Sequence, residues 1–136
     1  MRKLLVTAAI LGLVAVIAGP AIAGGKGGGS SIALVRLSDT ARLASSDPAF
    51  GEQVTFDVST SRTDWPWVQN RCWQGGRLVY EEWRGFYDGY TGGRTFVLGP
   101  TTNWAGGSAA CEGRLVRYAS GGNTQTLAST RYNVSG

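Results

Sequence analysis

Side chains that could perform acid–base or nucleophilic catalysis are scarce in this sequence. It contains no histidine, the commonest general base, and a Ser-Lys pair would have to use Lys26 in a glycine-rich stretch. Glu81 and Glu82 could suggest the two carboxyls of a glycosidase, but adjacent strand residues point to opposite faces and cannot converge. We therefore expect a protein that is not an enzyme and that uses no cofactor.

Cys72 and Cys111 are the only cysteines, and we expect them to form a disulfide. The expectation rests on their even number and on the export signal described below, because exported chains meet an oxidising compartment. A zinc site is the alternative, but two thiolates without histidine would have to recruit carboxylates to complete a tetrahedron. The sequence therefore predicts one disulfide and no metal site.

Aromatic residues are unusually dense between positions 65 and 104. A core of this size needs few large rings, so we expect some of them to be exposed, where Trp and Tyr provide rigid contact area for sugars or proteins. The alternative is that they cover open sheet faces and pack against arginine stems. Residues 83–91 form the candidate recognition loop. The candidate ligand-binding residues are Trp65, Trp67, Trp83, Phe86, Tyr87, Tyr90 and Trp104.

The first 23 residues have the pattern of a secretory signal peptide. Arg2 and Lys3 precede an apolar run over residues 4–17, and small residues follow up to Ala23. The run is shorter than the roughly 20 residues that span a bilayer. We expect cleavage after Ala23, a secreted product and no membrane attachment after cleavage. The alternative is an uncleaved anchor over residues 4–23, with the remainder of the chain outside the cell.

Charge gives no indication of a nucleic-acid partner. Loss of Arg2 and Lys3 would reduce thirteen cations to eleven, against nine carboxylates, a net charge of +2. The arginines are scattered singly from Arg36 to Arg131, whereas a surface that binds a polyanion needs several cations together. We expect no nucleic-acid partner.

The residues after the signal peptide predict a linker and one all-β domain. Residues 24–31, GGKGGGSS, have flexible-linker composition, and residues 32–136 are enough for one domain. The sequence shows no helical periodicity, and short runs of alternating apolar and polar residues recur between turn residues. In the clearest of these strands, Val54, Phe56 and Val58 should point inward. Two adjacent glycines, 75 and 76, predict a tight hairpin turn. The expected strands are residues 31–37, 54–60, 67–73, 77–82, 94–98, 108–118 and 125–134.

Seven short antiparallel strands predict an immunoglobulin-like or fibronectin-like β-sandwich. The cysteine positions differ from those of an antibody domain, because the second expected strand carries none and Cys72 falls on the third. The third and sixth strands of this topology are neighbours in one sheet. We therefore expect the bond between Cys72 and Cys111 to lie within a sheet instead of joining the two sheets.

Several segments resemble small secreted immunoglobulin-like proteins of unknown function from actinobacteria. The segments are GEQVTFDVST, PWVQNRCWQGGRLVY, TFVLGPTTNW, AGGSAACEGRL and LASTRYNV. The resemblance covers most of residues 32–134. It implies a sandwich fold and an extracellular location, and it brings no known activity, ligand or site residue.

These observations favour an exported, non-catalytic binding or adhesion module. It would recognise an extracellular protein or glycan through its exposed aromatic side chains. One alternative is a structural component of a surface or envelope, including that of a virion, whose rings contact further copies. Another is an inhibitor that presents a rigid loop to an extracellular enzyme.

Overall fold

The structure, a computed structural model, describes residues 29–37 and 47–136. This part consists of strands, connecting loops and one short 3-10 helix, η1 Ser120–Gly122. The predicted signal peptide, residues 1–23, and residues 24–28 of the predicted linker lie outside this part. Within the described ranges, no helix is long and apolar enough to cross a membrane. The strands are β1 Ser30–Arg36, β2 Gln53–Thr60, β3 Trp67–Gln74, β4 Arg77–Gly85, β5 Phe96–Val97, β6 Ala109–Tyr118 and β7 Thr124–Val134.

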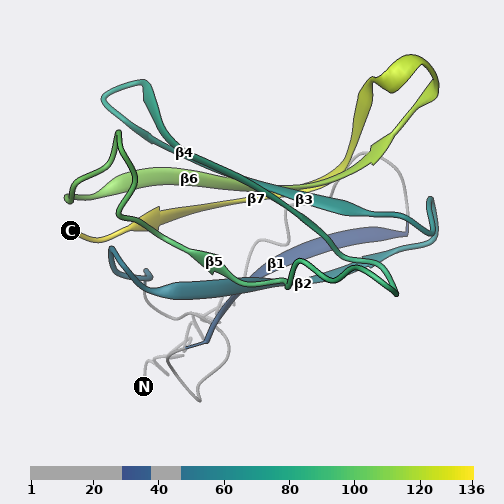
Figure 1. Ribbon diagram of the computed structural model, residues 1–136, viewed down its shortest axis with the longest axis horizontal. Helices are drawn as coiled ribbons and strands as arrows, with labels where there is room; N and C mark the ends of the chain where they lie inside the picture. Colours follow the sequence, from purple (N-terminus) through teal and green to yellow (C-terminus); the bar gives the residue numbers. More distant parts are fainter. Residues whose placement is uncertain (1–28, 38–46) are drawn as a thin grey trace, which may run out of the picture.

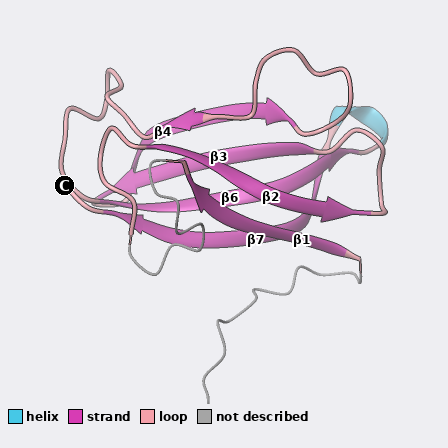
Figure 2. Ribbon diagram, turned by 90° about the horizontal axis from the view of Figure 1, so that it is seen from below, coloured by secondary structure: helices cyan, strands magenta, loops and turns pink. Residues whose placement is uncertain are grey.

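Two antiparallel sheets lie face to face, as the sequence predicts (Figures 1 and 2). One contains β1, β2 and β5 in the order β1-β2-β5, and the other has the order β4-β3-β6-β7. The fourth strand therefore pairs with the third, whereas in antibody constant domains it joins the sheet of the first two. The predicted immunoglobulin-like or fibronectin-like β-sandwich is confirmed.

Strand boundaries agree with the predicted ranges to within one residue except at β4 and β5. The strand β4 continues past the predicted residue 82 to Gly85. The predicted strand 94–98 is reduced to the two residues of β5, because Gly93 adopts φ +74° before it and Gly99 adopts φ +86° after it. Ser30 and Ser31 of the predicted linker belong to β1, where the Ser30 hydroxyl lies 2.8 Å from that of Thr60. The predicted turn at Gly75 and Gly76 is confirmed, with φ values of +55° and +79°.

A disulfide joins the two central strands of the four-stranded sheet. Cys72 of β3 and Cys111 of β6 are direct register partners, with Cα atoms 4.1 Å apart. Both side chains are buried against the other sheet. The predicted disulfide within one sheet is thus confirmed.

The core lies between the sheets and follows the predicted alternation. Val54 and Phe56 are buried, and Val58 packs partly buried against the same cluster. The Phe56 ring rests on Gly113 of β6, where a Cβ atom would collide with the ring. A glycine at this position lets the two sheets approach around a large aromatic side chain.

The contact between Phe56 and Gly113 yields a test of the packing. Gly113→Ala should lower the free energy of unfolding by about 1–3 kcal/mol, because the added methyl group overfills the core. Urea unfolding of the purified protein measures the change. Adding Phe56→Leu should reduce the penalty of the alanine, since leucine is smaller than phenylalanine. A Gly113→Ala variant as stable as the parent would show that the sheets do not pack as described.

Candidate functional site

Five aromatic side chains meet at the end of the sandwich where β3 begins and β6 ends. Trp67 is central, with ring centroids 5.6 Å from Tyr87, 5.4 Å from Tyr90 and 6.2 Å from Tyr118. Trp65 lies 5.1 Å from Tyr87, and all of these pairs are edge-to-face, a favoured aromatic geometry. We call these five residues the end cluster. Of its members, the sequence predicted every one except Tyr118.

The end cluster combines rings that pack together with rings that face solvent. Trp65 is 63% exposed and Tyr118 is 56% exposed, whereas Trp67, Tyr87 and Tyr90 are partly buried. The three partly buried rings therefore support the two exposed ones. The arrangement is a rigid aromatic surface at one end of the domain.

Small residues and hydrogen bonds hold the loop after β4 in this position. A Cβ atom on Gly85 would lie 2.6 Å from the rings of Tyr87 and Tyr90, so glycine is needed for their close approach. Arg84 donates a hydrogen bond of 2.6 Å to the carbonyl of Gly92. The backbone of the loop is thereby fixed to β4. Because the rings are already ordered, less conformational entropy is lost when a partner binds them.

Two of the predicted ligand-binding residues are buried. Phe86 is 7% exposed and stacks on Phe96, because the chain leaves β4 at this point and turns inward between the sheets. Trp104 is fully buried, packs edge-to-face against Phe50 and donates a hydrogen bond to the carbonyl of Gly107. Their assignment to an exposed binding surface is wrong, since both rings fill the core.

Trp83 is partly exposed but lies outside the end cluster. It belongs to β4, so the predicted recognition loop 83–91 begins in a strand and becomes a loop only at Phe86. The Trp83 indole donates a hydrogen bond of 3.1 Å to the carboxylate of Glu81. Trp83 therefore contributes to the outer face of the four-stranded sheet, the face turned away from the other sheet.

The outer face is organised in rows that cross the four strands in the order β4, β3, β6 and β7. Because paired residues of neighbouring strands point to the same side, the register of the ladder fixes which side chains share a row. We name three rows by their chemistry as the Arg114 row, the charged row and the Trp73 row. The Arg114 row contains Trp83, Gln69, Arg114 and Ser129. The charged row contains Glu81, Arg71, Glu112 and Arg131. The Trp73 row contains Leu78, Trp73, Ala110 and Asn133.

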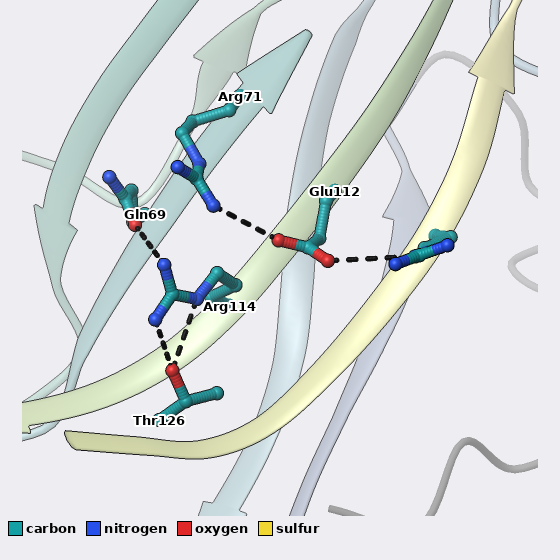
Figure 3. Close-up of polar contacts among 6 residues, drawn as sticks. Gln69, Arg71, Glu112, Arg114 and Thr126 are labelled. Carbon is teal, nitrogen blue, oxygen red and sulfur yellow. Dashed lines mark hydrogen bonds and ion pairs between the residues drawn. The ribbon is translucent and has the colours of Figure 1, made fainter.

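The charged row alternates in sign from one edge of the sheet to the other. Glu112 is its centre, and its carboxylate lies 3.2 Å from the guanidinium of Arg71 (Figure 3). The same carboxylate lies 3.6 Å from the guanidinium of Arg131. The guanidinium of Arg71 also lies 5.1 Å from the centre of the Trp73 ring. The side chain of Arg131 is 87% exposed, and Glu81 at the opposite edge is exposed as well.

Arg114 is held flat on the sheet by neutral acceptors. It donates a hydrogen bond of 3.3 Å to Gln69 and further bonds to the hydroxyl of Thr126 (Figure 3). In the part of the chain that the structure describes, no carboxylate forms an ion pair with it. The outer face thus carries a positive charge beside the balanced charged row.

Glu81 and Glu82 point to opposite faces, as predicted. Glu82 turns inward, where it accepts a 2.7 Å hydrogen bond from Tyr80 and pairs with Arg84. Glu81 turns outward to Trp83, so the two carboxylates cannot flank one substrate. Among residues 29–37 and 47–136, no group of three His, Cys, Asp or Glu side chains is arranged to hold a metal ion.

Comparisons with protein-family models, with curated proteins and with solved structures found no match to this chain. The resemblance to actinobacterial secreted proteins therefore stays a prediction. Trp67 and Tyr118 of the end cluster belong to the four-stranded sheet, which also forms the whole outer face.

Strand alternation in the sequence is a signal for Tyr118 and for the outward-facing residues of β6. Alternation along β6 places Glu112 and Arg114 on the outer side of the sheet, and the same alternation places Tyr118 there at the end of the strand. A register shift between Leu115 and Val116 leaves this alternation intact on the outer side. The sign order of the charged row, in contrast, becomes visible only once the strand order is known.

Buried tyrosines predict a pH dependence of stability. Burial raises the pKa of Tyr80, with a further contribution from its bond to Glu82, and burial also raises the pKa of Tyr132, which donates to Asn70. Unfolded tyrosines ionise near pH 10, where both folded phenols keep their protons. The unfolded state therefore loses protons first, and stability falls as the pH rises above about 10.

Urea unfolding midpoints measured from pH 8 to pH 11 test this dependence. The midpoint should decline above about pH 10, and Tyr132→Phe should weaken the decline. Tyr118→Phe, at an exposed ring of the end cluster, is the matched control. A flat midpoint over this range would mean that neither buried phenol is shielded from water as described.

Proposed function

We propose that the protein is an exported, non-catalytic recognition module that binds an extracellular protein or glycan through the end cluster. The observation that carries this proposal is the pair of exposed rings, Trp65 and Tyr118, supported by three partly buried ones. Trp and Tyr dominate the energetics of recognition surfaces, because they offer large contact area and have few rotatable bonds.

The surroundings of the end cluster support a binding role. Arg117 donates a hydrogen bond of 3.0 Å to the carbonyl of Arg62, which anchors the turn that carries Trp65 to β6. The amide of Phe86 donates a hydrogen bond of 2.9 Å to the carbonyl of Pro66, and this bond joins the same turn to the loop after β4. Such anchoring lowers the entropy lost when a partner orders these rings.

Export is supported by two independent features. The signal-peptide pattern of residues 1–23 predicts secretion, and the disulfide between Cys72 and Cys111 is the kind of bond that persists in oxidising compartments. A rigid disulfide-linked sandwich with an aromatic end suits recognition outside the cell. A surface of this kind meets polysaccharides and secreted proteins there.

Binding measurements on single variants test the proposal. The purified protein is applied to a glycan array and to an immobilised extracellular protein fraction of the source cells. Trp65→Ala and Tyr118→Ala should each weaken the interaction found at least about tenfold, because each removes a large exposed ring. The array and the protein fraction distinguish a sugar from a protein ligand.

Val97→Ala provides the matched control, because Val97 is also an exposed apolar residue (44%) but lies on β5 in the other sheet. It should bind like the parent protein. Circular dichroism checks that every variant is folded. If the parent protein binds nothing in either assay, or binds equally well without Trp65 and Tyr118, the proposed function is wrong.

A further inference from the structure

The charged row of the outer face has an order that is complementary to itself. Reading across the sheet, Glu81, Arg71, Glu112 and Arg131 alternate between negative and positive charge. The row begins with a carboxylate at one edge and ends with a guanidinium at the other. A copy of the row with its order reversed therefore presents an opposite charge at every position.

Such a reversal is produced by a two-fold axis that lies above the outer face, runs parallel to the strands and passes over the boundary between β3 and β6. It places β4 opposite β7 of the second copy, and β3 opposite β6 of that copy. Glu81 then faces Arg131 of the second copy, and Arg71 faces Glu112 of the second copy. From this match we propose that the outer face is the interface of a symmetric homodimer.

The direction of the axis follows from the same charges. A two-fold axis across the strands, centred on the charged row, would place Glu81 opposite Glu81 and Arg71 opposite Arg71 of the other copy. Like charges in direct opposition disfavour association. The axis parallel to the strands avoids this, and aligned packing within about 30° is a usual geometry for two sheets.

Side-chain size matches in the neighbouring rows. In the Trp73 row the axis brings Trp73 over Ala110 of the second copy, and in the Arg114 row it brings Trp83 over Ser129 of that copy. Ala110 lines two hollows of about 390 and 250 Å³ beside Trp73. Large rings would therefore meet small residues, which is the shape complementarity that an isologous interface needs.

The dimensions of the face come close to those of a standard protein interface. Four strands spaced about 4.8 Å apart and about 3.4 Å of rise per residue give a face roughly 19 Å wide and about 31 Å long along residues 109–117 of β6, which leaves Tyr118 of the end cluster outside it. Its projected area, about 590 Å², is about three quarters of the roughly 800 Å² per partner of a standard interface. Side chains that project from the face add to the surface area that the dimer would bury.

The dimer would also bring the two end clusters to the same end of the assembly, because an axis parallel to the strands preserves their direction. Two binding surfaces side by side raise avidity for a repetitive ligand. The dimer itself rests only on the charged row and its neighbours, so it stands whether or not the end cluster binds a ligand.

A charge exchange tests the dimer. Glu81→Arg and Arg131→Glu each create two like-charge contacts per dimer, and each should raise the dimer dissociation constant at least about tenfold in sedimentation velocity. Mixing the two variants should restore association, because each altered residue then faces an opposite charge. Both side chains are exposed, so the fold should tolerate the changes.

Asp57→Arg is the matched control, because Asp57 is exposed on β2 in the other sheet. It should associate like the parent, and circular dichroism checks the fold of every variant. Concentration-dependent dimerisation, lost in each single variant and regained in the mixture, supports the proposal. A parent protein that is monomeric at millimolar concentration would overturn it. So would dimers that ignore both single changes, or variants whose mixture fails to associate.

Discussion

The disulfide between Cys72 and Cys111 is the constraint on which the rest of the structure depends. It joins β3 and β6, the two central strands of the four-stranded sheet, at one register position with Cα atoms 4.1 Å apart. A slip of one residue would turn every side chain of a strand to the opposite face. Fixing one pair therefore fixes which residues of both strands face the core and which face outward.

Both faces of the sheet follow from this register. On the inner side it aligns Asn70 with Gly113, which leaves room for the Phe56 ring. On the outer side it aligns Arg71 with Glu112, the centre of the charged row, and Gln69 with Arg114. The end cluster and the self-complementary row are thus consequences of one strand pairing. Recognition and self-association would use different parts of the same surface.

The sequence predicted the strands well because alternation is a local property. The disulfide within one sheet was also predictable, since the strand that carries each cysteine could be counted. The burial of Phe86 and Trp104 was not predictable, because both lie in loops, Phe86 directly after β4 and Trp104 between β5 and β6. In a loop, strand alternation does not decide whether a ring turns inward. The partners of the charged row come from four strands, and Arg131 is distant from Glu81 in sequence. Only the sheet order brings them together.

The free energy of unfolding of the Cys72→Ala/Cys111→Ala double variant, compared with the parent protein by urea denaturation, tests the central role of the disulfide most directly. We expect a loss of about 2–5 kcal/mol, because the bond closes a long loop in the unfolded chain and fixes the central register in the folded one. A double variant within about 0.5 kcal/mol of the parent would contradict it, since such a change is typical of unimportant surface positions.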